Sequence, residues 1–595
     1  MRRFLTRFTP RRALVAAVLA VLLFQAAFWI PAARTRGFAS SDAGVKLWQT
    51  QSVVHTGQLD APLDYLGAVY DPQHIYSPFV PPWFYWQDGQ PYSEYSSPFI
   101  WASAPLYAAL GHKGLLLLPG LSGAVLIILA AWLMWRIRRD YWAVLAPLLV
   151  GLSSPLLIYS IEFWEHTPGA ALAAVALVGI VKAIDSRRRA LWLIASGAAI
   201  GLGLTMRAEL YVYPIAIVLG LVLLRPQLPF LRSVAFLALG GLLTAGPWWV
   251  YQAIRWGNPL GPRVAQNVPG LGGTDMLQRL GDTTGQNWTM AWPAAGSGVE
   301  WLNVLGAALI VLAVLALVFH RARLGRLVFW LSALTIVALA AILTWRLVHW
   351  QSEVGLRPDD LLTTFPVALL LFLLLPSSFA RRSPEATSLS RPLVSFLLVV
   401  AASFMVLVLL VSPFQGGVQW GPRFLLPVIV PLSVVLVDVV ARTWTEFGSV
   451  QFKRLQRLGL AAVLGVLLGV GGYSTYLGAQ FIRNGQNGNA EFQQTIEAAP
   501  EHVVVADAWF IPQGAPYTFE NKIWLMAEDE KKMLQLIQML RKQTDEPGMI
   551  YLSSLTWAHI DPQILLGPRI APNGDPHDFD WPGMYLRLAR YFLFK

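Results

Sequence analysis

The sequence predicts a mainly α-helical protein: a polytopic membrane bundle of about 13 transmembrane helices, with interfacial helices in its first outer loop and a small C-terminal α/β domain. Three observations support this fold class. Of the 595 residues, 55% are hydrophobic and only 13% are charged, whereas soluble domains carry about 25% charged residues. Apolar runs that approach the roughly 20 residues needed to cross a bilayer recur from residue 13 to residue 477. Beyond residue 479 the composition is that of a soluble domain.

The apolar runs are taken in chain order. The first follows five arginines and is predicted to be an uncleaved span, because it is longer than a signal-peptide core and no clear cleavage site follows it. Two of the runs, at Pro168 and Leu361, are short, which leaves the count open by one or two. The predicted spans are Ala13–Ala33, Leu115–Trp135, Tyr141–Tyr159, Pro168–Val181, Ala190–Met206, Leu210–Leu224, Val234–Tyr251, Leu302–Phe319, Leu327–Trp345, Leu361–Leu375, Pro392–Val411, Phe424–Val440 and Leu458–Leu477.

The distribution of basic residues predicts the orientation, because cytoplasmic loops carry the excess of Lys and Arg. With the N-terminus inside, the inner loops hold 24 of the 45 basic residues, whereas the longer outer loops and span ends before residue 480 hold 11. An odd number of spans then places the C-terminus outside. The sequence therefore predicts a multi-pass plasma-membrane protein whose long loops, above all 34–114, lie on the extracytoplasmic face.

The outer segments contain further predicted elements. In the first outer loop, Ala43–His55 and Pro98–Leu110 read as helices too short to span, which lie in the interfacial plane or pack on the bundle. The predicted domains are the bundle, 1–479, and an extracytoplasmic α/β domain, 480–595. In the second domain His502–Val505 and Met549–Ser553 read as strands, and Glu528–Lys542 reads as an amphipathic helix.

Composition also excludes some functions. The net charge is +11, but there is no basic low-complexity tail and much of the positive charge lies in short loops between spans, so no nucleic-acid partner is predicted. The chain has no cysteine, which excludes disulfides and thiol chemistry. The C-terminal segment has no glycine-rich phosphate fingerprint, so nucleotide binding is not predicted there.

Asp42 is the leading candidate for a catalytic residue. It follows the first span in the segment Ser40-Ser41-Asp42-Ala43-Gly44. A carboxylate at the membrane interface costs little to keep ionised and is well placed to act on a lipid-borne substrate. The alternative is that Ser40, Ser41 or Asp42 simply caps the helix that begins near Ala43.

The second outer loop concentrates further candidates: Glu162, Glu165 and His166 lie within one short turn. Carboxylate oxygens suit hard divalent cations, and an imidazole adds a ligand or a proton carrier. The alternative is a polar turn that faces water, with Pro168 starting the next helix. The choice between Glu162 and Glu165 as the functional carboxylate stays open.

Four arginines lie on the predicted outer side, although basic residues concentrate in cytoplasmic loops, so their positions need an explanation. A phosphate at the interface would supply one, because a guanidinium matches phosphate oxygens bidentately. The alternative is an arginine that snorkels to headgroups or pairs with a nearby acid, as Arg207 could with Glu209. The favoured phosphate contact is Arg423, at the outer end of the twelfth span, and the others are Arg207, Arg263 and Arg346.

A candidate substrate loop surrounds Glu94, which lies between Tyr92 and Tyr95. Aromatic side chains can stack on sugars. Tyr and Trp are also normal constituents of interfacial belts, and with 25 Trp in the chain the belt explains most of them.

Together these features resemble the GT-C superfamily of integral-membrane glycosyltransferases, which includes the protein O-mannosyltransferases and the bacterial aminoarabinose transferases of lipid A. The resemblance is architectural over nearly the whole chain. Locally it rests on four segments, in their order and on their side of the membrane: Ser41–Gly44, Glu162–His166, Met206–Glu209 and Pro422–Pro427. One departure is that Asp42 is followed by Ala43, where better-known members often carry an Asp-Glu pair.

The resemblance implies a polyprenyl-phosphate sugar donor and a lipid, glycan or protein acceptor. Asp42 would be the general base in an inverting transfer, and Arg423 would meet the donor phosphate. Glu162 or Glu165 would orient the acceptor or hold a divalent cation such as Mg²⁺ or Mn²⁺. The candidate metal ligands are Glu165 and Asp42.

Two other classes of function compete with this interpretation. A transporter or flippase for lipid-linked glycans would place charges near the bilayer midplane, but most predicted spans contain none, with Asp438 as an exception. A polysaccharide polymerase or glycan ligase would use a polyprenyl-diphosphate donor.

Overall fold

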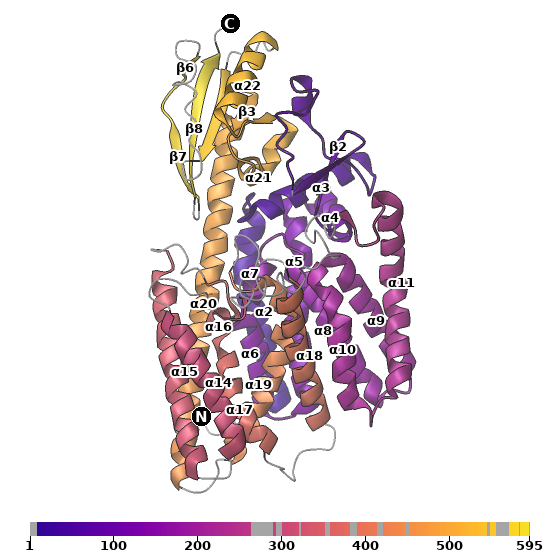
Figure 1. The fold of residues 1–595 in the computed structure, drawn as a ribbon, viewed down its shortest axis with the longest axis vertical. Coiled ribbons are helices and arrows are strands. Elements are labelled where there is room, and N and C mark those ends of the chain that lie inside the picture. The colour runs from indigo at the N-terminus through magenta and orange to yellow at the C-terminus, as the bar shows by residue number, and fades with distance from the viewer. Residues whose placement is uncertain are drawn as a thin grey trace, which may run out of the picture. The chain divides into compact units, whose positions relative to one another are not determined.

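The computed structural model describes most of the chain, and its helices and strands are shown in Figure 1. The described residues are 9–81, 83–262, 290–292, 300–319, 323–351, 358–380, 390–412, 420–446, 451–543, 548–554, 570–581 and 584–593. The chain separates into two compact units. We call Met1–Phe28, Pro119–Ser160 and Glu165–Ala479 the helical unit, and Trp29–Leu118, Ile161–Trp164 and Gln480–Lys595 the mixed unit.

The predicted membrane spans are present as helices. Among the described residues, nine helices are long and apolar enough to cross a bilayer, and four apolar segments are shorter. Each of the predicted runs falls on one of these thirteen segments, which confirms the predicted fold class. The long helices are α2 (Pro10–Arg34), α5 (His112–Ile137), α8 (His166–Asp185), α9 (Arg189–Met206), α11 (Phe230–Trp256), α15 (Arg323–His349), α18 (Ser390–Val411), α19 (Leu426–Glu446) and α20 (Gln451–Ala498).

The shorter apolar segments are Tyr141–Leu152, Ala208–Leu224, Val304–Leu315 and Pro366–Leu375. The first consists of η2 (Tyr141–Val144) and α6 (Leu145–Leu152), and the second of η3 (Ala208–Val212), α10 (Tyr213–Leu221) and η4 (Val222–Leu224). The third lies within α14 (Glu300–Phe319), and the fourth comprises η6 (Pro366–Ala368) and the first part of α17 (Leu369–Ala380).

Two predicted spans are interrupted in the structure, and both breaks occur next to a proline. The run Tyr141–Tyr159 is helical only to Leu152, and the short helix α7 (Leu156–Ser160) begins after Pro155. The run Leu361–Leu375 is divided into α16 (Leu361–Thr364), η6 and α17 at Pro366. Proline disfavours the helical conformation of the residue before it, which explains both breaks.

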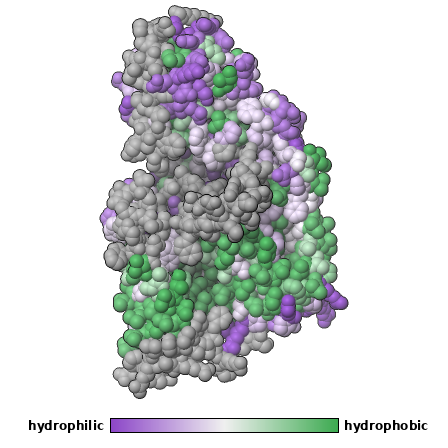
Figure 2. Space-filling model, in the orientation of Figure 1, coloured by the Kyte–Doolittle hydropathy of each residue, from purple (hydrophilic) through white to green (hydrophobic). Residues whose placement is uncertain are grey.

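Helix α19 forms the core of the helical unit, where its apolar window is completely buried. It contacts α6, α8, α17 and α18. Elsewhere, α9 packs closely on α11, because Gly197 of α9 and Gly240 of α11 each lie where a Cβ atom would come within 2.0 Å of a carbonyl oxygen of the other helix. On the face that Figure 2 shows, hydrophobic side chains gather over part of the helical unit.

The C-terminal part of the mixed unit contains a sheet with the strand order β4-β3-β5-β8-β6, in which β7 also pairs with β8. The strands β3 (Val503–Ala506), β4 (Ile523–Met526) and β5 (Gly548–Ser554) are parallel to one another. The strand β8 (Met584–Leu593) is antiparallel to β5, to β6 (Ile570–Pro572) and to β7 (His577–Trp581).

Apolar residues bury both faces of this sheet, as expected for parallel strands. Helix α22 (Glu530–Gln543) covers one face with apolar residues at helical spacing, Met533, Leu536, Ile537 and Leu540. The end of α20 and the short helix α21 (Phe510–Gly514) cover the other face. The strands predicted at His502–Val505 and Met549–Ser553 and the helix predicted at Glu528–Lys542 are all present within two residues of their predicted ends.

The first outer loop also belongs to the mixed unit. The two predicted loop helices are observed as α3 (Ser41–Thr56) and α4 (Ser97–Leu110), and η1 (Leu66–Val69) lies between them. A hairpin formed by β1 (Phe84–Gln87) and β2 (Gln90–Ser93) turns at Asp88 and Gly89, which both have positive φ angles. Helix α3 is largely buried and contacts α4, α21, β2 and η8 (Pro516–Glu520).

Candidate active site

The residues that precede Asp42 are held by one face of α20. The side chains of Gln486, Asn489 and Gln493 project from this face at helical spacing. Asn489 donates a hydrogen bond to the carbonyl oxygen of Phe38, and Gln493 donates to that of Arg36 at 2.6 Å. The approach is so close that a Cβ atom on Gly37 would lie 2.1 Å from the carbonyl oxygen of Gln486.

The loop 161–164 holds the same segment from another direction. Glu162 Oε2 accepts a hydrogen bond from the backbone N–H of Ala39 at 3.1 Å. Trp164 Nε1 donates to Ser40 Oγ at 3.0 Å. Gln486 joins the two supports, because its Nε2 donates to Ile161 O at 2.8 Å and to Glu162 Oε2 at 3.0 Å. We call this set of contacts the clamp, and it fixes where α3 begins.

Asp42 lies in the first turn of α3 and is only partly buried. The helix N-terminus favours a negative charge there. Tyr95 Oη donates a hydrogen bond to Asp42 Oδ1 at 2.6 Å, which orients the carboxylate. Of the three residues that the capping alternative named, Ser40 occupies the N-cap position without a side-chain capping hydrogen bond, and Asp42 lies inside the first turn.

Lys46 is a residue of this site that the sequence interpretation missed. It lies one turn after Asp42 on α3, and only 1% of its surface is exposed. Its Nζ lies 4.7 Å from the centroid of the Tyr95 ring, which is cation–π geometry. The available signal was a single lysine four residues after Asp42 in the apolar stretch Val45–Trp48.

Glu162 is fully buried in the loop between α7 and α8, outside the spanning helices. Burial raises the pKa of Glu162 from 4.5 to about 7, and the hydrogen bonds from Ala39 and Gln486 and the charge of Lys46 oppose this rise. Its Oε1 is buried and makes no hydrogen bond with any residue that the structure describes. Glu162 therefore supports Asp42 through the clamp, and its charge interacts with Lys46.

The other residues of the predicted substrate loop are buried beside the hairpin. Tyr92 lies in β2 and stacks on Tyr85 of β1, with ring centroids 6.0 Å apart. Glu94 follows β2 and is buried, and its backbone N–H donates to the carbonyl oxygen of Trp83. Of the three predicted loop residues, Tyr95 is the one whose hydroxyl is seen to donate a hydrogen bond to Asp42 Oδ1.

A second polar cluster lies within the helical unit. Arg207 Nη1 donates to Glu165 Oε1 at 2.6 Å, and Arg207 Nε donates to Glu209 Oε1 at 2.9 Å. All three side chains are buried. The pairing of Arg207 with Glu209 is the alternative that the sequence left open, and Glu165 adds a second carboxylate to the same guanidinium.

Arg423 and His166 lie near this ion-pair cluster. The guanidinium carbons of Arg423 and Arg207 lie 5.2 and 5.5 Å from the Phe424 ring centroid. His166 is buried at the start of α8, and its ring centroid is 5.5 Å from that of Tyr159. Tyr159 Oη donates to the carbonyl oxygen of Gly421 at 2.9 Å, two residues before Arg423.

Arg346 and Arg263 are the two remaining arginines that the sequence analysis named as candidate phosphate contacts. Arg346 forms a buried ion pair with Asp360, the N-cap residue of α16, and donates to Thr363 Oγ1 at 3.0 Å. Its charge is therefore balanced within the protein. Arg263 lies outside the described residues, so its predicted role stays a prediction.

The residues proposed to hold a metal ion are bonded to other groups. Glu165 pairs with Arg207, and Asp42 accepts a hydrogen bond from Tyr95. Within the described ranges, no group of three or more His, Cys, Asp or Glu side chains is placed to hold a metal ion. The expectation of Mg²⁺ or Mn²⁺ at Glu165 and Asp42 stays a prediction.

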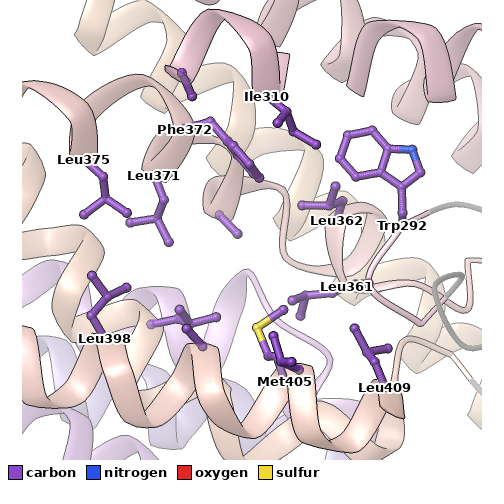
Figure 3. Close-up of a pocket in the computed structure, with 16 residues that line it drawn as sticks. Trp292, Ile310, Leu361, Leu362, Leu371, Phe372, Leu375, Leu398, Met405 and Leu409 are labelled. Carbon is purple, nitrogen blue, oxygen red and sulfur yellow. The ribbon is translucent and has the colours of Figure 1, made fainter. Parts of the chain in front are cut away.

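The helical unit also contains an apolar cavity of about 570 Å³. Side chains of α17 and α18 face each other across it (Figure 3). Residues of α14, α16, η6 and α19, together with Ala291 and Trp292, complete the lining. All but two of the labelled side chains are hydrocarbon, the exceptions being the thioether of Met405 and the indole of Trp292. The cavity therefore suits an aliphatic chain.

Comparisons with known proteins bear on the fold. Neither protein-family models nor curated proteins match the sequence. Among solved structures, ArnT from Cupriavidus metallidurans bound to undecaprenyl phosphate matches with 13% identity, a TM-score of 0.50 and 97% coverage of each chain. Its apo state matches with 12% identity, a TM-score of 0.49 and the same coverage. An oligosaccharyltransferase from Archaeoglobus fulgidus matches with 12% identity and a TM-score of 0.48, over 91% of this chain and 69% of the other.

The likeness to ArnT extends over nearly the whole chain, as the architectural resemblance predicted. At this level of identity it establishes the fold alone. The chain has the fold of ArnT.

Proposed function

We propose that the protein is a membrane glycosyltransferase that moves a sugar from a polyprenyl-phosphate donor to an acceptor hydroxyl, with inversion at the anomeric carbon. The observation that carries the proposal is the Asp42 site: a carboxylate fixed by the clamp and by the 2.6 Å hydrogen bond from Tyr95. The likeness in fold adds support, because the ArnT structure contains undecaprenyl phosphate.

The proposed chemistry needs a base and a good leaving group. Asp42 takes the proton of the acceptor hydroxyl as the hydroxyl oxygen attacks the anomeric carbon. The bond between that carbon and the phosphate oxygen breaks, and the polyprenyl phosphate leaves with the bonding electrons. A phosphate can leave without protonation when cations stabilise its charge, so one carboxylate base is sufficient.

Glu162 is the carboxyl group proposed to support the acceptor side of the site. It is fully buried, and its hydrogen bonds to Ala39 and Gln486 position the segment that leads into Asp42. Glu165 has a different environment, because it shares Arg207 with Glu209. These contacts favour Glu162 over Glu165 as the second functional carboxyl group.

Arg423 is the arginine of the helical unit that we propose for contact with a phosphate. Arg207 binds two carboxylates, and Arg346 binds Asp360. Arg423 lies at the outer end of the twelfth predicted span, and its guanidinium carbon is 5.2 Å from the Phe424 ring centroid. The apolar cavity of the same unit offers the kind of lining that an isoprenoid chain needs.

The proposed setting is the plasma membrane, with the N-terminus in the cytoplasm and the C-terminal segment outside. The excess of Lys and Arg in alternate loops supports this orientation. The proposed acceptor is a hydroxyl of a lipid, a glycan or a protein on the extracytoplasmic face.

The test uses the full chain in nanodiscs with radiolabelled polyprenyl-phosphate sugars and a panel of lipid, glycan and peptide acceptors. The variant Asp42→Asn removes the base, and Asp88→Asn in the hairpin turn is the matched control. We expect the wild type and Asp88→Asn to transfer label, and Asp42→Asn to lose about 100-fold or more of the rate.

Two results would contradict the proposal. Transfer by Asp42→Asn at the rate of the wild type would show that Asp42 is not the base. Movement of label across sealed vesicles without transfer would instead support a flippase.

A further inference from the structure

The carboxyl ends of β3 and β5 gather polar side chains that the proposed transfer reaction does not use. Strand β3 lies between β4 and β5, and the three strands are parallel. The chain passes from β3 to β4 through α21 on one face of the sheet, and from β4 to β5 through α22 on the other face. The strand order therefore reverses at β3. In open sheets, ligands bind outside the carboxyl ends of the strands at such a point.

Asp507 follows β3 directly, and two groups of β5 hold its carboxyl group. Its Oδ1 accepts a hydrogen bond from the backbone N–H of Ser554 at 2.9 Å, and its Oδ2 accepts one from the Tyr551 hydroxyl at 3.3 Å. Burial raises the pKa of Asp507 from 3.8 to about 7, and none of the described groups that act on this carboxyl is a lysine or an arginine. A carboxylate has about four lone-pair sites, so it can accept further hydrogen bonds.

Ser553 and Ser554, the last two residues of β5, are the second component of this cluster. Only 1% and 0% of their surfaces are exposed, and neither Oγ atom makes a hydrogen bond with any residue that the structure describes. Alternate residues of a strand face the same side, so Ser553 shares a face with Tyr551, whose hydroxyl reaches Asp507. A buried hydroxyl without a partner is destabilising. Two such hydroxyls next to a carboxyl group therefore point to a ligand that supplies hydrogen bonds.

An aromatic surface adjoins these polar groups in the sequence. Trp509 comes two residues after Asp507, at the start of α21, and is only partly buried. Its ring stacks on that of Trp83 from the first outer loop, with centroids 5.0 Å apart and planes at 28°. Trp83 is also only partly buried. Aromatic faces combined with a few polar groups are typical of small-molecule sites.

The chemistry of these groups selects a neutral ligand with many hydroxyl groups. Asp507 would repel an anion, and the described groups that act on its carboxyl include no lysine or arginine to attract one. A hydrocarbon ligand would leave the hydroxyls of Ser553 and Ser554 unpaired. A sugar hydroxyl both donates and accepts, as a serine hydroxyl does, and a sugar ring also has an apolar C–H face that can pack on an indole.

We propose that this end of the sheet binds a neutral saccharide. The hydroxyls of Ser553 and Ser554 and the carboxyl group of Asp507 form hydrogen bonds with sugar hydroxyls. The indole of Trp509 packs against the sugar ring. The site consists of other residues than the Asp42 site, and it holds a glycan without reacting with it. It therefore goes beyond the proposed transfer reaction.

The first arm of the test uses the full wild-type chain in nanodiscs, without any sugar donor. Calorimetry measures the binding of neutral trisaccharides of glucose, mannose and N-acetylglucosamine, and of the charged trimers of glucosamine and galacturonate. We expect a neutral trisaccharide to bind with a Kd of about 1 mM or below, and both charged trimers to bind at least about tenfold more weakly. No binding of a neutral trisaccharide up to about 10 mM, or tighter binding of a charged trimer, would overturn the inference.

The second arm removes both unpaired hydroxyls in a Ser553→Ala, Ser554→Ala double variant. Because these hydroxyls have no described partner, we expect the thermal unfolding midpoint to stay the same or to rise, and saccharide affinity to fall at least about tenfold. Trp509→Leu should weaken binding by about fivefold, and wild-type affinity in this variant would overturn the stacking contact. The control is Ser103→Ala in α4, because this buried serine donates to the carbonyl oxygen of Phe99 at 2.8 Å.

A lower midpoint with wild-type saccharide affinity in the double variant would mean that buried water pairs the two hydroxyls, which would overturn the inference. The outcome is separate from that of the transferase proposal, because no donor is present. Saccharide binding by a protein that transfers no sugar would support this site and count against the transferase. Sugar transfer by a protein that binds no saccharide at the sheet would do the reverse.

Discussion

The hydroxyl of Tyr95 donates a hydrogen bond to Asp42 Oδ1 at 2.6 Å, although 53 positions separate the two residues in the sequence. Tyr95 follows the hairpin strand β2, and Asp42 opens α3. The contact therefore depends on the packing of the first outer loop within the mixed unit. It fixes the orientation of a carboxylate that is only partly buried.

Replacing Tyr95 with Phe tests this orientation. The ring that faces Lys46 remains and only the hydroxyl is lost, so we expect a loss of about 1 kcal/mol in stability and about tenfold in the rate of sugar transfer. Steady-state transfer and thermal unfolding measure the two effects. Tyr85→Phe, in β1 of the same hairpin, is the control, and equal rates for the two variants would exclude an orienting role for Tyr95.

The clamp leads to a second prediction, for Gln486→Ala. This change removes the donor to Ile161 O and Glu162 Oε2. We expect unfolding to become easier by about 1–3 kcal/mol, because buried acceptors lose a partner. Transfer should also slow, since the segment 36–40 loses part of its support.

A double-mutant cycle with Glu162→Gln gives the coupling between the two clamp residues, which we expect to be about 0.5–3 kcal/mol. Glu491→Ala, an exposed change on the same helix, is the control. A coupling near zero would mean that the clamp does not act as a unit.

The local parts of this structure were predictable from the sequence, and the site contacts were not. The hydrophobic pattern of a segment indicates locally whether the segment is buried. The spans, the loop helices and the strands β3 and β5 could therefore be predicted from the pattern of apolar residues. The short strands β1, β2, β4, β6 and β7 and the longer strand β8 were missed. Tertiary packing decides such segments.

At the site, Asp42 and Glu162 were found because acids are conspicuous outside apolar runs. The bond between Ala39 and Glu162 spans 123 positions, and no local spacing indicates it. Lys46 was missed because a lysine within a loop helix normally faces water, whereas here it is buried. The polar face of α20 was missed because it lies beyond the last predicted span.

The pKa of Glu162 gives a third prediction, for the dependence of stability on pH. Burial raises this pKa from 4.5 to about 7, so the folded protein holds the proton more tightly than the unfolded chain. The contribution is fully present below about pH 4.5 and is lost as pH rises through about 7. Its size is on the order of 3 kcal/mol.

Glu162→Gln keeps a neutral side chain and should remove this part of the pH dependence. Asp507 has a pKa raised from 3.8 to about 7 by burial, so it contributes with the same sign. Thermal midpoints between pH 4.5 and 8 should fall less in Glu162→Gln and in Asp507→Asn than in the wild type, and least in the double variant. An unchanged slope in Glu162→Gln would contradict the assignment.

The ion-pair cluster of the helical unit gives a fourth prediction, which separates structural arginines from functional ones. Arg207→Met would leave Glu165 and Glu209 buried beside each other without their shared cation. Breaking a buried pair in this way costs about 3–5 kcal/mol. We therefore expect a large fall in the thermal unfolding midpoint of Arg207→Met. Adding Glu165→Gln to this variant should partly restore the midpoint, because it removes one of the two unpaired buried charges.

The control for this prediction is Arg255→Met, where the guanidinium lies 4.4 Å from the Trp256 ring at the end of α11. If Arg207→Met instead retained the wild-type midpoint and lost only donor binding, Arg207 would belong with Arg423 among the phosphate contacts.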